Sequence, residues 1–239
     1  MTGRQAVPAP GVLLAGTDTG VGKTTVARGL LRLAHDRDYQ LVPFKPVETG
    51  CDGGWPRDAA HLLEAASLPG LALVDVCPYP FTAPLAPSIA ARHERRTIDV
   101  DDILSRAADL RRRGDGLLVE SAGGLLTPWA PGVTAADLAQ ALGLTLLIVA
   151  ANRLGVINHA ALVAAEVRRR ALPCLGLVLV DVSPTFSPDQ PYNAAEIAQH
   201  TGVRILGTLG YITEPDTGAI ARQVATDLDL ATLFGGRLV

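Results

Sequence analysis

Lysine is scarce in this chain of 239 residues, which has two lysines against nineteen arginines. We expect a chain that uses arginine almost everywhere to keep lysine where a compact ammonium on a flexible stem is required, as in a tight phosphate cradle that a planar guanidinium would overfill. The two lysines are Lys23 and Lys45, both near the N-terminus. The scarcity therefore marks these two positions as candidates for a functional site.

A strong net charge is also absent, since the formal charge is −3. This balance excludes a global field that would draw the protein to nucleic acid, and the two basic runs, at residues 111–113 and 168–170, each end a helix-like stretch. Three cysteines stand far apart with no C-x-x-C pair, which argues against a disulfide framework or a zinc site. The 48% hydrophobic and 19% charged residues indicate a globular protein.

Long hydrophobic runs are missing as well. The longest dense apolar run, residues 144–151, suits a buried strand and is too short to span a bilayer. The apolar run at residues 12–15 is too short for a signal-peptide core, and residues 1–10 are polar and proline-bearing. We therefore expect a cytoplasmic protein that binds neither membrane nor nucleic acid.

Short apolar runs recur along the chain with helix-like segments between them. The runs are continuous rather than alternating, which is typical of strands covered on both faces. Strand–helix alternation predicts an α/β fold with a doubly wound, mainly parallel sheet of about seven strands, and we expect a single domain over residues 1–239. The predicted strands cover residues 11–15, 40–44, 71–76, 116–120, 144–150, 174–181 and 204–209.

The first predicted strand runs into a glycine-rich loop, GTDTGVGKTT at residues 16–25, and a helix starts near Lys23. This context is what a phosphate-binding P-loop requires, because glycines let backbone N–H groups turn inward and the helix N-terminus adds positive potential. Lys23 would reach the β- and γ-phosphates of a nucleotide, and the Thr24 hydroxyl would bind Mg²⁺. The other residues of the cradle are Gly20, Val21, Gly22 and Thr25. The fold is therefore predicted to be of the P-loop NTPase type.

The loop departs from two common patterns. Five residues rather than four separate Gly16 from Gly22, so Thr17 stands where the standard motif begins with glycine. Asp18 occupies the position, five residues before Lys23, where partition and cell-division ATPases carry an additional lysine. The sequence therefore disfavours a switch ATPase that dimerises over its nucleotide.

Three charged side chains lie at the ends of other predicted strands or at the start of a predicted helix. Glu120 ends a strand, where a carboxylate faces the ligand crevice and can hold Mg²⁺; the alternative is a solvated strand-end acid. Lys45 ends the second strand and would share that sheet edge with Lys23, offsetting charge on a transferring phosphoryl group; the alternative is a surface lysine. Asp58 begins a helix over residues 58–64 and is interpreted either as its N-cap or as a metal ligand.

With these residues in place, the chain resembles the dethiobiotin synthetase family over nearly its whole length. The Gly-Thr-Asp-Thr loop joined to Lys-Pro-Val at residues 45–47 separates this family from most P-loop proteins. The matching segments are residues 16–24, 45–50, 58, 84–90, 119–128 and 154–159.

The resemblance implies an ATP-dependent cyclo-ligase that forms the ureido ring of dethiobiotin from 7,8-diaminononanoate, CO₂ and MgATP. An amine takes up CO₂ as a carbamate, the carbamate attacks the γ-phosphate to give a carbamic–phosphoric anhydride, and the second amine displaces phosphate. The physical requirement is to hold several anionic oxygens together and to offset their repulsion.

The resemblance also implies roles for particular residues. Lys23 contacts the transferring phosphate, and the Mg²⁺ ligands are Thr24, Asp58 and Glu120. Thr19, Lys45 and Thr49 hold the region of the carbamate and the γ-phosphate. In this family a turn at a helix start binds the substrate carboxylate across the two-fold interface of a homodimer. In this chain that turn contains Gly155, Val156 and Asn158.

Three positions depart from the family pattern. Ser121 replaces the usual glycine after the metal-binding glutamate and is expected to narrow the pocket. Val180 stands where many members have an asparagine that reads the adenine edge, and valine cannot make that hydrogen bond. Residues 210–212 lack the proline often found in a later base-contacting loop. We therefore expect relaxed selectivity for the base of the triphosphate.

Two other functions fit parts of the sequence. One is a nucleotide-switched regulatory ATPase of the partition class, against which Asp18 and the Lys45-Pro46 strand end argue. The other is a stand-alone cobyrinate-type amide synthetase domain, whose relatives append a glutaminase domain; we expect none in a chain that ends at residue 239.

Overall fold

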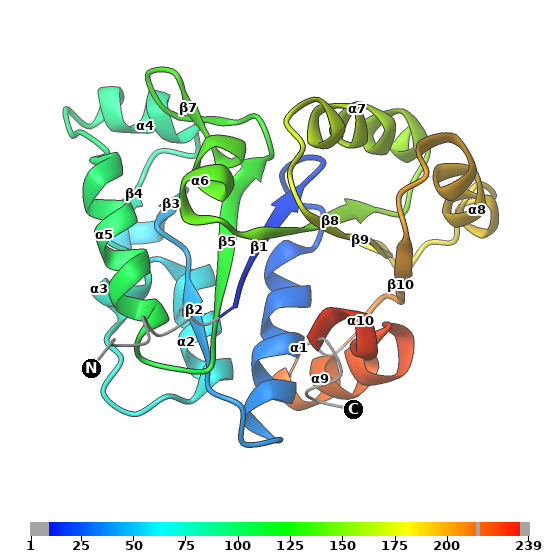
Figure 1. Cartoon of the computed structure of the whole chain (residues 1–239), viewed down its shortest axis with the longest axis horizontal. Helices are drawn as coiled ribbons and strands as arrows, with labels where there is room; N and C mark the ends of the chain where they lie inside the picture. Colours follow the sequence, from blue (N-terminus) through cyan, green and yellow to red (C-terminus); the bar gives the residue numbers. More distant parts are fainter. Residues whose placement is uncertain (1–9, 214–215, 235–239) are drawn as a thin grey trace, which may run out of the picture.

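The computed structural model describes residues 10–213 and 216–234, and it confirms the predicted α/β fold class (Figure 1). Its centre is a six-stranded sheet in the order β10-β9-β8-β1-β5-β2, and every adjacent pair of strands is parallel. The strands of this sheet are β1 (Gly11–Gly16), β2 (Leu41–Phe44), β5 (Gly116–Gly124), β8 (Thr145–Ala151), β9 (Cys174–Val180) and β10 (Ile205–Leu209).

Helices cover both faces of the sheet, as Figure 1 shows. On one face the packed helices are α1 (Lys23–His35), α2 (Arg57–Ala66), α9 (Thr217–Asp227) and α10 (Leu230–Phe234). On the other face they are α4 (Pro87–His93), α5 (Val100–Arg111), α6 (Ala135–Leu142), α7 (Val156–Arg169) and α8 (Gln190–Thr201). The sheet is therefore doubly wound, with a separate hydrophobic core on each face.

The two cores explain why the strands read as continuous apolar runs. Leu13 and Leu14 are successive residues of β1, and both are fully buried. Leu13 packs into the core beneath α5, α6 and α7, whereas Leu14 packs into the core beneath α1 and α9. Because side chains alternate across a strand and water reaches neither face, no polar residue is required between apolar ones.

Two small sheets lie outside the central one. The short strands β3 (Val47–Thr49) and β4 (Tyr79–Phe81) pair in parallel, and β6 (Pro128–Ala130) pairs with β7 (Val133–Thr134) in an antiparallel ribbon. The first of these pairs directly follows the end of β2 and carries Thr49. It therefore fixes the chain on both sides of Pro46, just after Lys45 leaves the central sheet.

The strand predicted at residues 71–76 is wrong, and the central sheet has six strands rather than about seven. This segment contains the short helix α3 (Leu73–Val76). The Asp75 carboxylate accepts a hydrogen bond from the backbone N–H of Ala72 at 3.0 Å, which stabilises a helical first turn. Leu71, Leu73 and Val76 pack against residues of α2 in a small separate cluster instead of entering the sheet. A short apolar run does not by itself distinguish a strand from a helix.

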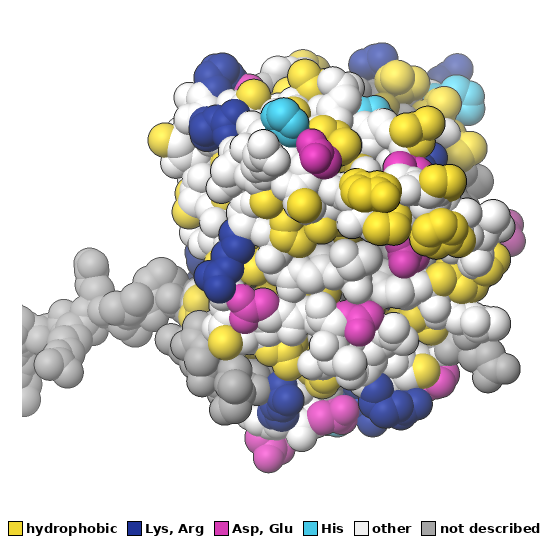
Figure 2. Space-filling model, turned by 90° about the vertical axis from the view of Figure 1, so that its right-hand side faces the viewer, with side chains coloured by type: hydrophobic (Ala, Val, Ile, Leu, Met, Phe, Trp, Pro, Cys, Tyr) yellow, Lys and Arg dark blue, Asp and Glu magenta, His cyan; other side chains and the backbone are white. Residues whose placement is uncertain are grey.

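In the basic runs at residues 111–113 and 168–170, Arg111 and Arg168 donate to backbone carbonyls, and the other arginines pair with nearby acids. Arg113 pairs with Asp75, Arg169 pairs with Glu166, and Arg170 pairs with both Glu166 and Asp137. On the side of the molecule that carries α8, Figure 2 shows basic and acidic side chains interspersed rather than gathered by sign. These runs therefore form no basic stripe of the kind that tracks a phosphate backbone.

Some expectations concern segments outside this description. Residues 1–9, which the sequence suggests are not a signal peptide, lie outside the described residues, as do 214–215 and 235–239. A single domain over residues 1–239 therefore stays a prediction. Within residues 10–213 and 216–234, no helix has the length and hydropathy needed to cross a bilayer.

Candidate functional site

A cavity of about 660 Å³ lies at the C-terminal edge of the central sheet and contains most of the predicted site. Its walls come from the loop between β1 and α1, the chain after β2, the start of α2, the C-terminal part of β5 and the segment that leads into α4. The predicted site residues that line it are Thr19, Gly20, Val21, Gly22, Lys23, Thr24, Thr25, Lys45, Thr49, Asp58 and Glu120.

The loop between β1 and α1 has the backbone geometry that its glycines permit. Gly20 and Gly22 have φ angles of 71° and 93°, in the left-handed region that favours glycine, and Gly22 is the N-cap residue of α1. A Cβ atom on Gly16 would lie 2.7 Å from Lys23 Nζ. The missing side chain at Gly16 therefore leaves the space in which the Lys23 ammonium folds back over the loop.

Lys23 is buried, and its Nζ donates a hydrogen bond to the backbone carbonyl of Asp18 at 3.0 Å. Burial lowers the pKa of Lys23 below its ordinary value, although the negative charge of Glu120 acts in the opposite direction. An ammonium that has lost most of its water and has few partners is prepared to bind an anion.

Lys45 is only 4% exposed, so the alternative of a surface lysine is wrong. Its Nζ donates to Glu120 Oε1 at 2.5 Å and to Asp58 Oδ2 at 2.9 Å. Burial alone would lower the pKa of Lys45, but the charges of Glu120 and Asp58 outweigh it and hold the pKa above its ordinary value. Lys45 is therefore a protonated cation held between two carboxylates inside the cavity.

Glu120 is fully buried, so the alternative of a solvated strand-end acid is also wrong. β5 continues past it to Gly124, and its Oε1 accepts hydrogen bonds from Lys45 and from the Thr24 hydroxyl at 2.9 Å. Its other oxygen, Oε2, is buried and has no hydrogen-bond partner among the described residues. A buried carboxylate oxygen without a partner is rare in folded proteins and calls for an additional ligand.

These residues fit a Mg²⁺ ion. Oxygen atoms are the donors that this hard cation prefers, and here the Glu120 carboxylate, the Asp58 carboxylate and the Thr24 hydroxyl line one cavity. Within the described ranges there is no cluster of three or more His, Cys, Asp or Glu side chains that would hold a metal alone. A site with two carboxylates suits Mg²⁺ that is held together with substrate phosphates.

Asp58 is not the N-cap of its helix, so that interpretation is wrong. α2 begins at Arg57 and its N-cap residue is Pro56, which has no side-chain acceptor. Instead, the Glu48 carboxylate of β3 accepts hydrogen bonds from the backbone N–H groups of Asp58 and Ala59, each at 2.9 Å. The Asp58 carboxylate is therefore left to contact Lys45. Burial would raise the pKa of Asp58, but the charge of Lys45 outweighs it and the pKa lies below its ordinary value.

Glu48 was missed by the sequence reasoning, although it is buried and lines the cavity. Ordinary helix caps precede the helix directly, whereas Glu48 caps α2 from β3, ten residues before Asp58. No local spacing marks such a contact. The available signal was an acidic residue inside an otherwise apolar segment, Pro46-Val47-Glu48, since a buried acid requires partners.

The predicted turn at Gly155, Val156 and Asn158 does not line this cavity. Gly155 is the N-cap residue of α7, with a φ of 94° and no side-chain cap hydrogen bond. Ser121, in contrast, is fully buried in the cavity wall, and its hydroxyl donates to the backbone carbonyl of Gly123 at 3.1 Å. The structure therefore brings together the predicted phosphate and metal residues but not the predicted carboxylate turn.

A smaller cavity of about 220 Å³ adjoins the same loop at the ends of β9 and β10. It shares Gly20, Gly22 and Thr25 with the first cavity, and its other walls are residues 180–182 and 209–212. Val180 packs so closely that a Cβ atom on Gly22 would lie 2.7 Å from Val180 Cγ1. Both groups that the sequence associates with the nucleotide base, Val180 and residues 210–212, meet here.

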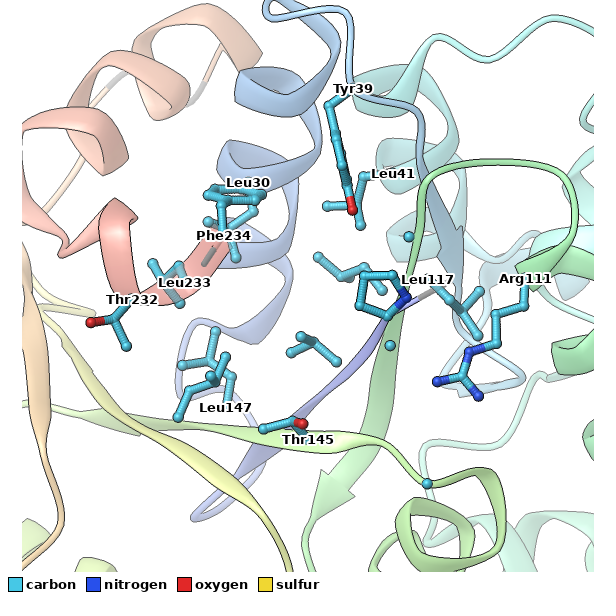
Figure 3. Close-up of a pocket in the computed structure, with 17 residues that line it drawn as sticks. Leu30, Tyr39, Leu41, Arg111, Leu117, Thr145, Leu147, Thr232, Leu233 and Phe234 are labelled. Carbon is cyan, nitrogen blue, oxygen red and sulfur yellow. The ribbon is translucent and has the colours of Figure 1, made fainter. Parts of the chain in front are cut away.

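A third cavity, of about 400 Å³, lies at the opposite, N-terminal edge of the sheet (Figure 3). Figure 3 shows Leu30, Leu147, Leu233 and Phe234 around it, with Arg111 at one side. No residue of the glycine-rich loop lines it. Its wall is mostly apolar and contains neither Lys23 nor Lys45.

Comparisons with known proteins matched a family model and several named relatives. A family model described as an AAA domain matches residues 10–217. The chain is 43% identical to the ATP-dependent dethiobiotin synthetase BioD of Anaeromyxobacter dehalogenans (strain 2CP-C), over 91% of this chain and 96% of that protein. It is 31% identical to the ATP-dependent dethiobiotin synthetase BioD of Bacillus subtilis (strain 168), over 94% of this chain and 97% of that protein.

A solved structure supports the fold. The cell division protein FtsY of Thermotoga maritima matches with a TM-score of 0.53 and 18% sequence identity, over 92% of this chain and 70% of that one. At this identity the likeness concerns the fold alone, and it agrees with the predicted P-loop NTPase type.

The contact between Glu48 and α2 leads to a first prediction. Glu48→Ala removes the acceptor of two backbone N–H groups and should lower the free energy of unfolding by about 0.5–2 kcal/mol, measured by urea denaturation. The matched control is Glu64→Ala, an exposed acid on the same helix, which should change stability by less than about 0.5 kcal/mol. Equal effects of the two substitutions would contradict the assigned role of Glu48.

Proposed function

Because the chain belongs to the AAA-domain family whose model it matches and, within it, to the ATP-dependent dethiobiotin synthetases, we propose that it closes the ureido ring of dethiobiotin from 7,8-diaminononanoate, CO₂ and ATP. One observation carries the proposal: Lys45 is buried between Glu120 and Asp58 in the cavity that also holds Lys23 and the glycine-rich loop. This arrangement offers two ammonium groups to the anionic groups that such a reaction must bring together.

The first step that the proposal requires is attack of a carbamate oxygen on the γ-phosphorus of ATP, with ADP as the leaving group. Two anions must approach each other, and their repulsion opposes the reaction unless fixed positive charge lies beside them. Lys23 and Lys45 supply that charge from two different elements, the glycine-rich loop and the end of β2. Because both ammonium groups are buried, little solvent has to reorganise as charge moves.

The second step is attack of the free amine on the carbonyl carbon of the carbamic–phosphoric anhydride, which closes the ring and expels phosphate. The departing phosphate remains next to Lys23 and Lys45, whose charges stabilise it as it forms. Thr19 and Thr49 also line the cavity and offer hydroxyl groups to the carbamate and phosphate oxygens. Positioning and electrostatics, rather than a covalent enzyme intermediate, are sufficient for this chemistry.

The metal proposal rests on the two oxygens of Glu120. Oε1 holds Lys45 and Thr24, so Oε2 remains for a cation, with Asp58 on the other side of Lys45. Mg²⁺ held by Thr24, Asp58 and Glu120 would neutralise charge on the β- and γ-phosphate oxygens. The same two carboxylates then position the cation and the Lys45 ammonium relative to each other.

The substrate carboxylate is proposed to bind at the start of α7 in the second subunit of a homodimer. Gly155 provides no side-chain cap, and the Val156 N–H already donates to the Arg153 carbonyl at 3.0 Å, so the N–H groups of residues 157 and 158 are the ones suited to bind an anion. Leu154 directly precedes this turn, Leu162 lies about two turns further along α7, and the two are 83% and 63% exposed. Exposed leucines beside a binding turn are typical of a surface that a second subunit covers. We also propose that the enzyme acts in the cytoplasm.

The two alternative functions are not favoured. Relatives that are named dethiobiotin synthetases match more than nine-tenths of the chain. Asp18, which replaces the additional lysine of partition ATPases, pairs with Arg153 at 3.4 Å instead of adding a positive charge to the loop. Neither the regulatory ATPase nor the amide synthetase has a comparable observation in its favour.

The decisive assay measures phosphate release with ATP. Release should require both bicarbonate and 7,8-diaminononanoate, and dethiobiotin should accumulate in equal amount, measured by mass spectrometry. Lys23→Ala is the control that removes the ammonium of the phosphate loop, and it should abolish release. Phosphate release that does not depend on the diamino acid would refute the proposed function.

A further prediction concerns Lys45. Lys45→Ala should lower kcat by about 10²–10³-fold while the Kd for ATP changes by less than about threefold, because its charge is needed mainly in the transition state. Lys45→Arg should also be poorly active, since a planar guanidinium does not fit the space of an ammonium held 2.5 and 2.9 Å from two carboxylates. Full activity of the arginine variant would show that charge alone is sufficient.

A substitution at Leu162 tests the proposed homodimer. Leu162→Glu places a charge on the proposed interface and should give a monomer in analytical ultracentrifugation, with a large rise in KM for the diamino acid and little change in ATP affinity. The control is Leu233→Ala, a residue that lines the cavity at the N-terminal edge of the sheet rather than the surface around α7. A dimer that survives the glutamate substitution would place the interface elsewhere.

A further inference from the structure

The cavity at the ends of β9 and β10 has one charged side chain in its wall, Asp181. The cavity adjoins the glycine-rich loop on the side away from Lys45 and Glu120, so a triphosphate held by that loop would extend its base here. The other polar side chains in the wall are Thr25 and Tyr211, and Val180 offers only methyl groups. Asp181 is therefore the charged side chain in this cavity that is available to recognise the base.

The Asp181 carboxylate is fixed by amide groups from two other elements. Its Oδ1 accepts hydrogen bonds from Asn152 Nδ2 at 2.8 Å and from Gln190 Nε2 at 3.2 Å. Asn152 follows β8 and is buried, and Asn193 of α8 donates to Asn152 Oδ1 at 2.9 Å. The orientation of Asp181 is thus set by a buried network and does not depend on the bound nucleotide.

The two oxygens of Asp181 have different surroundings. Oδ1 is shared by two amide donors, whereas Oδ2 accepts no hydrogen bond from residues 10–213 or 216–234. The backbone N–H of Asp181 is already paired with the carbonyl of Leu209 at 2.9 Å. The polar group that this residue can still offer in the cavity is therefore a hydrogen-bond acceptor.

An acceptor distinguishes bases by their donors. An ionised carboxylate accepts hydrogen bonds and donates none. Adenine and cytosine each present an exocyclic amino group, and guanine presents N1–H beside its 2-amino group. Uracil presents its single N3–H between two carbonyl oxygens, which a carboxylate would meet with like-sign repulsion.

We propose that Asp181 selects nucleoside triphosphates whose base carries an amino group, so that CTP and GTP serve near the level of ATP while UTP and ITP do not. This inference rests on the proposed function, because it assigns a base to the triphosphate that the reaction consumes. The proposal predicts which triphosphates are preferred once Val180 has relaxed the selectivity for the base. Valine removes the contact that favours adenine, and Asp181 retains the preference for a donor.

The experiment compares two pairs of triphosphates that differ at the amino group, CTP with UTP and GTP with ITP. In each pair the amino-bearing member should have a kcat/KM about tenfold higher or more, because one good base contact discriminates by about that factor. Asp181→Asn keeps the size of the side chain but offers a donor as well as an acceptor, and it should bring each pair to within about threefold. Equal use of CTP and UTP by the unchanged protein would overturn the proposal.

A matched control separates selectivity from stability. Asp189→Asn changes a nearby carboxylate of the same network, which bonds Asn193 and Ser187 but does not line the cavity, and it should preserve both ratios. Binding of CDP and UDP by isothermal titration should show the same preference in the absence of chemistry. If Asp181→Asn weakens all nucleotides equally and leaves the ratios unchanged, the residue only holds its loop and the proposal fails.

The outcomes for this inference and for the proposed function are distinguishable. Phosphate release that depends on bicarbonate and the diamino acid tests the reaction with ATP alone, which carries an amino group and suits both proposals. If that release occurs and the base ratios do not depend on Asp181, the selectivity proposal fails and the ligase assignment stands.

Discussion

The buried contact of Lys45 with Glu120 and Asp58 is the interaction on which the rest of the site depends. The Lys45 and Glu120 side chains are almost completely buried, whereas the Asp58 side chain is 42% exposed, and neither buried charge would be stable there without the other. The contact also joins three elements, since the residues come from the end of β2, from β5 and from α2. The same contact therefore balances the charges in the cavity and fixes the positions of the three elements around it.

Residues outside this group of three charged side chains help to hold the arrangement in place. Glu48 holds the first turn of α2 and so fixes where the Asp58 carboxylate can lie, while Gly16 leaves room for the other ammonium, Lys23. The glycine-rich loop lies between two cavities, one lined by both lysines and several carboxylates and one in which Asp181 is the single charged side chain. A long anionic ligand with a planar end would match this change of polarity along the loop.

Much of the fold and the site was predictable from local signals. Continuous apolar runs separated by helical segments indicated a doubly wound sheet, and the ends of parallel strands indicated where Lys45 and Glu120 would meet Lys23. The failures have physical causes. The run at residues 71–76 was too short to distinguish a strand from a helix, and the capping role assigned to Asp58 belongs to Glu48, a residue that tertiary contact brings to the helix. The turn at Gly155 lies outside the cavity, and no local pattern in the sequence fixes whether a distant turn reaches it.

The order of strands in the sheet has a consequence for how the protein is made. β1, which carries the glycine-rich loop, lies between β5 and β8, with residue 12 paired beside residues 118 and 145. A nascent chain that has emerged only as far as α4 contains both lysines but neither neighbour of its first strand. Contacts this distant in sequence make folding slow, and during translation they delay it until the middle of the polypeptide has left the ribosome. Nucleotide therefore cannot assist folding until β5, which carries Glu120, has joined β1 and completed the wall of the pocket.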